Sequence, residues 1–263
     1  MQLFDTHAHL DDAAFANDLT QVIQRAQDGG VIGILAVGIS AASSEAVIRL
    51  AEKFPMVWAA VGIHPNYAAQ AQAEDWWQIE KLAQHPKVVA IGETGLDRYW
   101  DYTPFALQEE YFVRHLALAR QTGRPIVIHC REAEADLRRI LQQDYDVHGS
   151  LKGILHAFSG EWATAEFGLA MGLHVSFAGM VTFRNAEDLR QVAARIPAQR
   201  LLIETDSPYL TPVPLRGKVS RNEPAHIVHT LTCLAQVRQV EPTTLAAETT
   251  ANARHLLGID SAD

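Results

Sequence analysis

The sequence predicts an α/β fold of the (β/α)8 TIM-barrel type, with room for some distortion. Apolar runs typical of buried strands alternate along the whole chain with amphipathic stretches typical of helices. This alternation indicates β-α-β units, and the nearly continuous apolar strands indicate a parallel sheet covered on both faces. Eight such units within 263 residues match a barrel. A doubly wound open sheet is the alternative.

The expected elements follow one another without an intervening linker. Strands are expected to begin near Leu3, Val31, Val57, Val88, Ile126, Gly153, Leu173 and Leu201. Helices are expected over 18–28, 42–54, 73–84, 107–121, 133–143, 161–171 and 185–195. The tail from 224 to 258 predicts two further helices, the second beginning near Pro242. Because no repeat or low-complexity segment interrupts the chain, we expect a single domain over 1–263.

The composition narrows the class of protein. The chain is 48% hydrophobic and 20% charged, as is usual for a soluble globular protein. We find no apolar run long enough to span a bilayer and no secretory signal. The two cysteines, Cys130 and Cys233, fit a reducing cytoplasm and exclude a cysteine-type zinc cluster. With a net charge of -9, the chain would need bound cations or a local basic patch to attract a polyanion.

Candidate metal ligands follow several of the expected strands. In the stretch 4–11, His7 and His9 are two residues apart and share a strand face, so both imidazoles can reach one cation. A single His after a strand is more often structural, but the ends of barrel strands converge on one mouth. The candidates that this convergence brings together are His7, His9, Glu93, His129, His156 and Asp206.

These four imidazoles and two carboxylates exceed the needs of one tetrahedral ion and suit two divalent ions. Glu93 is the expected bridging ligand, because it directly follows an apolar strand in the middle of the chain. One ion would take His7, His9, Glu93 and Asp206, and the other Glu93, His129 and His156. Such a pair activates water, and Asp206 is a candidate to accept its proton. Mg, Mn and Zn all remain open, although imidazole ligands favour a transition metal.

For four more residues near these strand ends, the sequence allows a functional and a structural role. His64 either contacts substrate or acts as a general acid, or it supports the turn 62–65. Glu204 is either a partner of a ligand His or a carboxylate lower in the barrel. Arg131 meets a substrate anion or pairs with a neighbouring glutamate. Cys130 should point away from the site, toward the helices, and we interpret it as core rather than as a nucleophile.

Two loops contain candidate nucleic-acid contacts. The loop 215–224 carries Arg216, Lys218 and Arg221 after the last strand, where barrels often bind phosphate. It is otherwise an exposed loop. Tyr99, Trp100 and Tyr102 follow the fourth strand, where they either stack on bases or cap the barrel.

The motifs resemble, in order, those of the TatD family of metal-dependent deoxyribonucleases in the amidohydrolase-like superfamily. Beyond 4–11, the similar motifs are Gly62-Ile63-His64-Pro65, Ile91-Gly92-Glu93-Thr94-Gly95-Leu96-Asp97, His129-Cys130-Arg131, His156-Ala157-Phe158-Ser159-Gly160, Glu204-Thr205-Asp206-Ser207-Pro208 and Arg221-Asn222-Glu223-Pro224. The resemblance extends to the region of Asn252. It implies a barrel, two divalent ions on the same six ligands, and hydrolysis of DNA, often from the 3′ end of single strands. Glu132 and Arg98 depart from the family pattern near the expected substrate.

The function predicted from the sequence is therefore a TatD-like 3′-5′ exonuclease on single-stranded DNA. Asp206, Glu93 and His64 are its predicted catalytic residues, and His64, Arg131 and Arg221 its predicted substrate contacts. We expect a cytoplasmic monomer without a membrane partner. One alternative is a metallohydrolase that cleaves an amide or ester bond, such as the bond of an aminoacyl-tRNA. A non-catalytic binding protein is the other.

Overall fold

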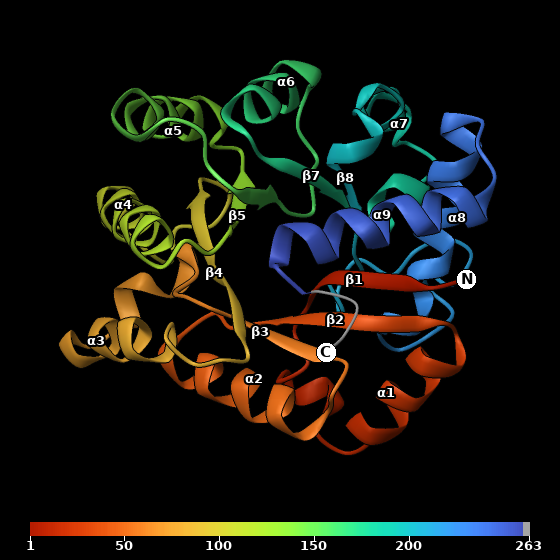
Figure 1. Ribbon diagram of the computed structural model, residues 1–263, viewed down its shortest axis with the longest axis horizontal. Helices are drawn as coiled ribbons and strands as arrows, with labels where there is room; N and C mark the ends of the chain where they lie inside the picture. The colour runs from red at the N-terminus through yellow and green to blue at the C-terminus, as the bar shows by residue number, and fades with distance from the viewer. Residues whose placement is uncertain (260–263) are drawn as a thin grey trace.

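The computed structural model describes residues 1–259, in which eight parallel strands form one sheet in the order of the chain (Figure 1). The strands are β1 (Leu3–Ala8), β2 (Val31–Val37), β3 (Val57–Val61), β4 (Val88–Asp97), β5 (Ile126–Arg131), β6 (Gly153–Leu155), β7 (His174–Phe177) and β8 (Leu201–Ile203). A bridge between Ala8 and Ser207 joins the two edges near the mouth. This sequential order confirms the barrel, and the doubly wound alternative is wrong.

The helices surround the strands in sequence order, as Figure 1 shows. They are α1 (Leu19–Asp28), α2 (Ala41–Lys53), α3 (Ala73–Leu82), α4 (Phe105–Thr122), α5 (Glu134–His148), α6 (Trp162–Met171), α7 (Glu187–Arg195), α8 (Ile227–Arg238) and α9 (Pro242–Leu257). All the expected helices are present, including the two in the tail. The main difference is α5, which continues to His148 instead of ending near Gln143. In its last turn the apolar Val147 is exposed and only Tyr145 packs against the core, so apolar periodicity did not mark the end of the helix.

Two apolar layers hold the barrel together. The larger lies between strands and helices and includes Ile34, Ile91 and Phe112. The smaller fills the barrel interior with side chains such as Phe4 and Val127, and residues at the end of α9 belong to it. Helix α9 therefore closes the end of the barrel opposite the mouth, because its side chains pack beneath the interior layer.

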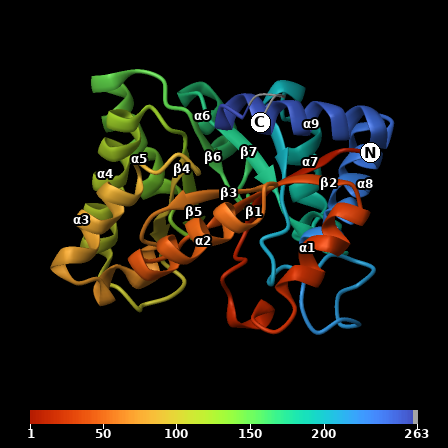
Figure 2. The same ribbon diagram turned by 60° about the horizontal axis from the view of Figure 1, so that its bottom comes forward.

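Loops at the carboxyl ends of the strands form the mouth. Short 3-10 segments follow β1 (Ala13–Phe15), β3 (Pro65–Gln70), β7 (Gly179–Thr182) and β8 (Pro224–His226), whereas Ala198–Arg200 precedes β8 at the other end of the barrel. Figure 2 shows the loops after β1 and β8 extending side by side. The Tyr209 hydroxyl donates to Asp12 Oδ2 across them at 2.9 Å. Among residues 1–259, no helix has the length and apolar character needed to cross a membrane.

Candidate metal centre

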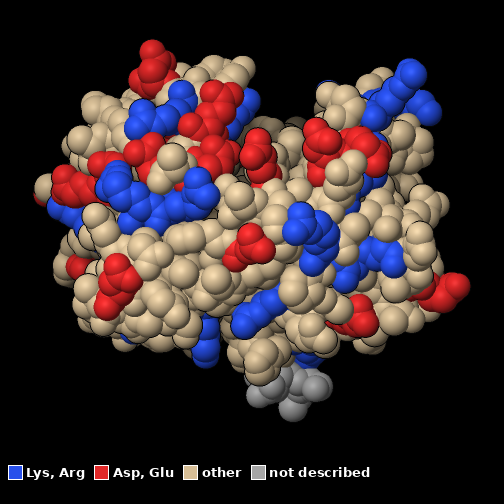
Figure 3. Space-filling view, turned by 90° about the horizontal axis from the view of Figure 1, so that it is seen from above, with Lys and Arg blue, Asp and Glu red and all other residues tan. Residues whose placement is uncertain are grey.

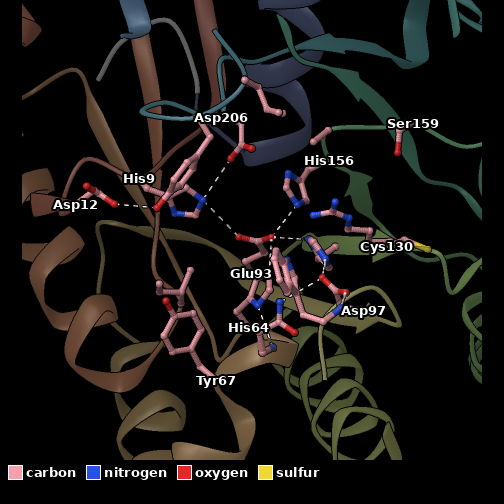
Figure 4. A pocket seen from close by; sticks show the side chains of 18 of the residues that line it. His9, Asp12, His64, Tyr67, Glu93, Asp97, Cys130, His156, Ser159 and Asp206 are labelled. Carbon is pink, nitrogen blue, oxygen red and sulfur yellow. Dashed lines mark hydrogen bonds and ion pairs between the residues drawn. The ribbon is translucent and has the colours of Figure 1, made fainter. Parts of the chain in front are cut away.

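The six predicted ligands meet at the mouth of the barrel around Glu93, which lies between His9 and His156 in Figure 4. A cavity of about 570 Å³ opens above them, and His7 is buried beneath its surface. This volume lies within the range of small-molecule sites, roughly 300–1,000 Å³. The charged and imidazole residues that line it are His9, Asp11, Asp12, His64, Glu93, Asp97, His129, Arg131, His156 and Asp206.

The two carboxylate oxygens of Glu93 face different groups of imidazoles. Oε2 lies 3.3 Å from His7 Nε2 and 3.6 Å from His9 Nε2. Oε1 lies 3.1 Å from His129 Nδ1 and 2.7 Å from His156 Nε2. The Glu93 side chain is almost fully buried, and its Oε2 has no hydrogen-bond partner among the described residues. Glu93 thus has the arrangement expected of a carboxylate that bridges two cations.

The donor spacing around His7 and His9 fits a cation. Two ligands of a tetrahedral ion such as zinc lie roughly 3.3 Å apart, given metal–nitrogen distances near 2.0–2.1 Å. His7 Nε2 and His9 Nε2 are 3.2 Å apart, and Asp206 Oδ1 lies 3.3 Å from His9 Nε2 and 3.7 Å from His7 Nε2. Unprotonated nitrogens and carboxylate oxygens this close repel one another unless a proton or a cation lies between them. The residues present therefore fit a divalent ion.

Ligand-type donors gather in three overlapping groups of three, each with all donor atoms within 4.8 Å. One group is His7, His9 and Glu93, as predicted for the first ion. A second joins His7, His156 and Asp206, and the third contains His64, Glu93 and His129. His156 thus contacts both predicted ion sites, and the rings of His7 and His156 stack 4.0 Å apart. The predicted division of ligands between two ions stays a prediction.

Charge balance keeps both carboxylates of the centre ionised. Burial raises the pKa of Glu93, but the interactions with His156 first and with the other imidazoles around it outweigh burial and hold that pKa well below its usual range. The pKa of Asp206 is also lowered, because its hydrogen bond with His9 outweighs the effect of burial. Burial lowers the pKa of His9, yet Asp206 and Glu93 raise it to about 9. A concentration of buried negative charge beside imidazoles is the electrostatic setting of a cation site.

Three of the candidate ligand imidazoles are oriented through their second ring nitrogen. His9 Nδ1 donates to the Val37 carbonyl at 3.2 Å, and His156 Nδ1 donates to Glu204 Oε1 at 3.4 Å. His129 Nε2 donates to Asp97 Oδ2 at 2.9 Å. Each contact places the ring proton away from the centre and leaves the other nitrogen free to bind a cation. The position of Glu204 supports the interpretation that it is the partner of a candidate ligand His.

Asp97 is a site residue that the sequence argument missed. Its Oδ1 accepts from the backbone N–H groups of Tyr99 (2.9 Å) and Trp100 (3.0 Å), and Asn66 Nδ2 donates to Oδ2 at 3.2 Å. Burial raises the pKa of Asp97, but the hydrogen bond from His129 and these contacts lower it to about 2. The available signal was its spacing, because Asp97 lies four residues after Glu93 and ends the same strand.

His64 lies beside Glu93, but its ring carries the proton on the nitrogen that faces the centre, so it is a hydrogen-bond donor there. Its Nδ1 accepts the N–H of Asn66 at 3.0 Å, so the ring proton sits on Nε2, which lies 3.4 Å from Glu93 Oε1. Burial lowers the pKa of His64 to about 3, so the ring is neutral at physiological pH. Next to it, buried His115 accepts the N–H of Ile63 at 3.0 Å. These contacts support the turn and leave the His64 Nε2 proton facing the centre, so its role toward substrate stays a prediction.

The two arginines predicted to contact substrate differ in their surroundings. Arg131 lines the cavity, its guanidinium carbon lies 3.6 Å from the centre of the Tyr99 ring, and no carboxylate among residues 1–259 pairs with it. Arg221 is paired with Asp18 and Glu223 and does not line the cavity. The predicted substrate contact of Arg221 does not fit this placement, because its charge is neutralised within the fold. A basic loop in a sequence does not reveal which of its residues has a carboxylate nearby.

Two further residues bear on the local structure. Burial and the charge of Glu134 raise the pKa of Cys130 to about 12, so its thiol stays protonated, as suits a residue that is no nucleophile. Cys130 packs against the core, and its sulfur points away from Glu93 in Figure 4, as expected, although the residue also forms part of the cavity wall. At Gly95, which has a φ of 138°, a Cβ atom would lie 2.0 Å from the His129 carbonyl oxygen. Glycine therefore lets β4 approach β5 beside a ligand.

Comparison with known proteins places this centre in a family. The sequence matches the family "TatD related DNase" over residues 4–258. The chain belongs to the TatD family. The "uncharacterized metal-dependent hydrolase YabD" of Bacillus subtilis strain 168 is 40% identical over 98% of this chain and 100% of its own length. The "3′-5′ ssDNA/RNA exonuclease TatD" of Escherichia coli K12 is 38% identical over 98% of this chain and 99% of its own.

A solved TatD homologue has the same architecture. The crystal structure of YjjV from Escherichia coli K12 superimposes with a TM-score of 0.91 at 28% identity, covering 98% of both chains. The resemblance inferred from the motifs is thus confirmed, as is the prediction of a TatD-type metal-dependent hydrolase.

Proposed function

We propose that this TatD-family protein is a 3′-5′ exonuclease that hydrolyses phosphodiester bonds of single-stranded DNA. The observation that carries the proposal is the Glu93 carboxylate, whose two oxygens face separate groups of imidazoles beneath an open cavity. Paired cations of this kind suit in-line displacement at phosphorus. The relative from Escherichia coli K12, named as an ssDNA/RNA exonuclease, supports the same substrate class.

The ligands of the proposed two ions are His7, His9, Glu93, His129, His156 and Asp206. When bound, Mg, Mn or Zn ions would supply Lewis-acid activation of water and neutralise charge on the phosphate. Asp206 is ionised and lines the cavity, so it can accept the proton of the attacking water. Neutral His64 can donate its Nε2 proton in a hydrogen bond to a phosphate oxygen, and Arg131 can pair with a phosphate at the rim.

Local charge, rather than net charge, has to attract the substrate. The chain carries a net charge of -9. On the side that carries α5, α6 and α7, basic and acidic side chains are intermixed and form no continuous basic surface (Figure 3). Cations in the mouth together with Arg131 would provide the attraction that this helical side does not. Cytoplasmic location and a monomeric state remain predictions.

The test uses a 5′-labelled single-stranded DNA oligonucleotide, purified protein and added divalent metal. Wild type should give a ladder of products shortened from the 3′ end, and EDTA should abolish it. Asp206→Ala should give no ladder, whereas Asp188→Ala, at an exposed site on α7, should match wild type. Absence of cleavage in a protein that holds about two ions per chain would exclude the nuclease. An amide or ester substrate would then be the next to assay.

A further inference from the structure

Three aromatic residues after β4 form an exposed cluster at the rim, which we call the aromatic shelf: Tyr99, Trp100 and Tyr102. Their exposed fractions are 49%, 41% and 57%. The rings of Trp100 and Tyr102 stack with centroids 5.3 Å apart, and Tyr99 meets Trp100 edge-on at 4.8 Å. Trp100 also lines the cavity above the metal centre. Contiguous apolar side chains that face water at a site commonly mark an interaction surface.

The aromatic shelf is fixed relative to the centre. Asp97, which orients His129, also accepts the backbone N–H groups of Tyr99 and Trp100. On the other side, the Arg131 guanidinium lies 3.6 Å from the Tyr99 ring centre and 5.9 Å from that of Trp100. A cation stacked on aromatic rings beside a phosphate site can contact the backbone of a nucleic acid while the rings contact its bases.

The opposite wall of the cavity has the opposite charge. Asp11 and Asp12 line it after β1, and among residues 1–259 no Lys or Arg pairs with either. Since β1 and β5 are four positions apart in an eight-stranded sheet that closes, these carboxylates lie across the mouth from Arg131. Repulsion there disfavours passage of a phosphate backbone, so a bound strand should leave the cavity over the aromatic shelf.

We infer that the aromatic shelf, through Trp100, stacks on a base of a nucleotide that flanks the scissile phosphate. This inference rests on the proposed nuclease function and adds a basis for its preference for single strands, because a base within a duplex cannot present its face. Removing one base–aromatic stack costs about 5- to 150-fold in affinity. The loss should appear in KM rather than in kcat, because Trp100 contacts the base and not the reacting atoms.

The experiment combines variants with modified substrates. Wild type, Trp100→Ala and Trp100→Phe are assayed on a single-stranded DNA oligonucleotide and on two versions with an abasic nucleotide at the last or the penultimate 3′ position. Trp77→Ala is the matched control, because Trp77 is 64% exposed on α3 and does not line the cavity. Trp100→Leu, which has no aromatic face, replaces Trp100→Ala if that variant has a lowered melting temperature.

On normal DNA, Trp100→Ala should raise KM about 5- to 150-fold, and Trp100→Phe should keep KM near the wild-type value. On one of the two abasic substrates, wild type and Trp100→Ala should have equal KM values, since the base that stacks is missing. An equal loss on all three substrates would overturn the inference and leave Trp100 a structural role, and so would an unchanged KM on normal DNA. If wild type cleaved none of the oligonucleotides, the proposed function itself would fail, which is a different result.

Discussion

Asp97→Asn should weaken metal binding without unfolding the protein. In the wild type, Asp97 Oδ1 accepts two backbone N–H groups, while Oδ2 accepts from His129 Nε2 at 2.9 Å. In the variant, the two backbone donors require the amide oxygen to occupy the Oδ1 position. The amide NH2 then faces His129 Nε2, where two donors would meet.

His129 can relieve this conflict by moving its proton to Nδ1. That nitrogen lies 3.1 Å from Glu93 Oε1 and is the expected ligand atom, so the favoured tautomer of the variant cannot bind a cation. Removal of a carboxylate that orients a ligand His typically costs 10- to 100-fold in metal affinity, or about 1.4–2.8 kcal/mol. We expect a loss in this range for the ion held by His129.

The assay is calorimetric titration of the EDTA-treated protein with Zn or Mn, accompanied by a thermal melt. The control is Asp101→Asn, an exposed carboxylate in the same loop that does not line the cavity. It should bind metal as wild type does. If Asp97→Asn bound metal within about twofold of wild type, Asp97 would not set the tautomer of His129, and the argument from its hydrogen bonds would be refuted.

Two further predictions concern stability. Gly95→Ala should lower the free energy of unfolding by about 3 kcal/mol or more, because its Cβ would collide with the His129 carbonyl. Gly123→Ala, at φ 69° with open space around it, should lower it by only about 1 kcal/mol. Urea unfolding measures both. Burial lowers the pKa of His115 from 6.5 to about 4, so between these values the unfolded chain binds a proton that the folded protein does not. Stability should therefore fall by about 3 kcal/mol as the pH drops from 6.5 to 4. Wild type and His148→Gln, an exposed control, should both show this contribution, and a His115→Gln variant with an unchanged pH dependence would contradict it.

Patterns along the chain were sufficient to predict the barrel and the meeting of the candidate ligands at its mouth, for a physical reason. A parallel strand buried on both faces is a continuous apolar run, and a polar residue that ends it has few other roles at a barrel mouth. Glu93, His129 and His156 each follow such a run. Their convergence needed no knowledge of side-chain conformations, only of the strand order.

Residues whose roles depend on partners were harder to assign. Asp97 lies in a motif with Glu93, yet its function arises from a hydrogen bond to His129 on the neighbouring strand. Arg221 resembled a phosphate ligand, but Asp18, distant in sequence, neutralises it. Which charges remain free is decided by tertiary contacts, and a single sequence does not contain that information.

Because the barrel closes between β1 and the segment after β8, the two groups of candidate ligands can come together at different stages of folding. Glu93, His129 and His156 come from β4, β5 and the end of β6, so their donors can assemble once the middle of the chain has folded. His7, His9 and Asp206 meet only when the two ends of the barrel join, where Thr205 donates to Asp5 across 200 residues of sequence. A cation bound by these three residues would stabilise the closed barrel. It would oppose the chain entropy that favours separation of β1 from the segment after β8. The complete set of candidate ligands would then be assembled only when the barrel closes, as the last step of folding.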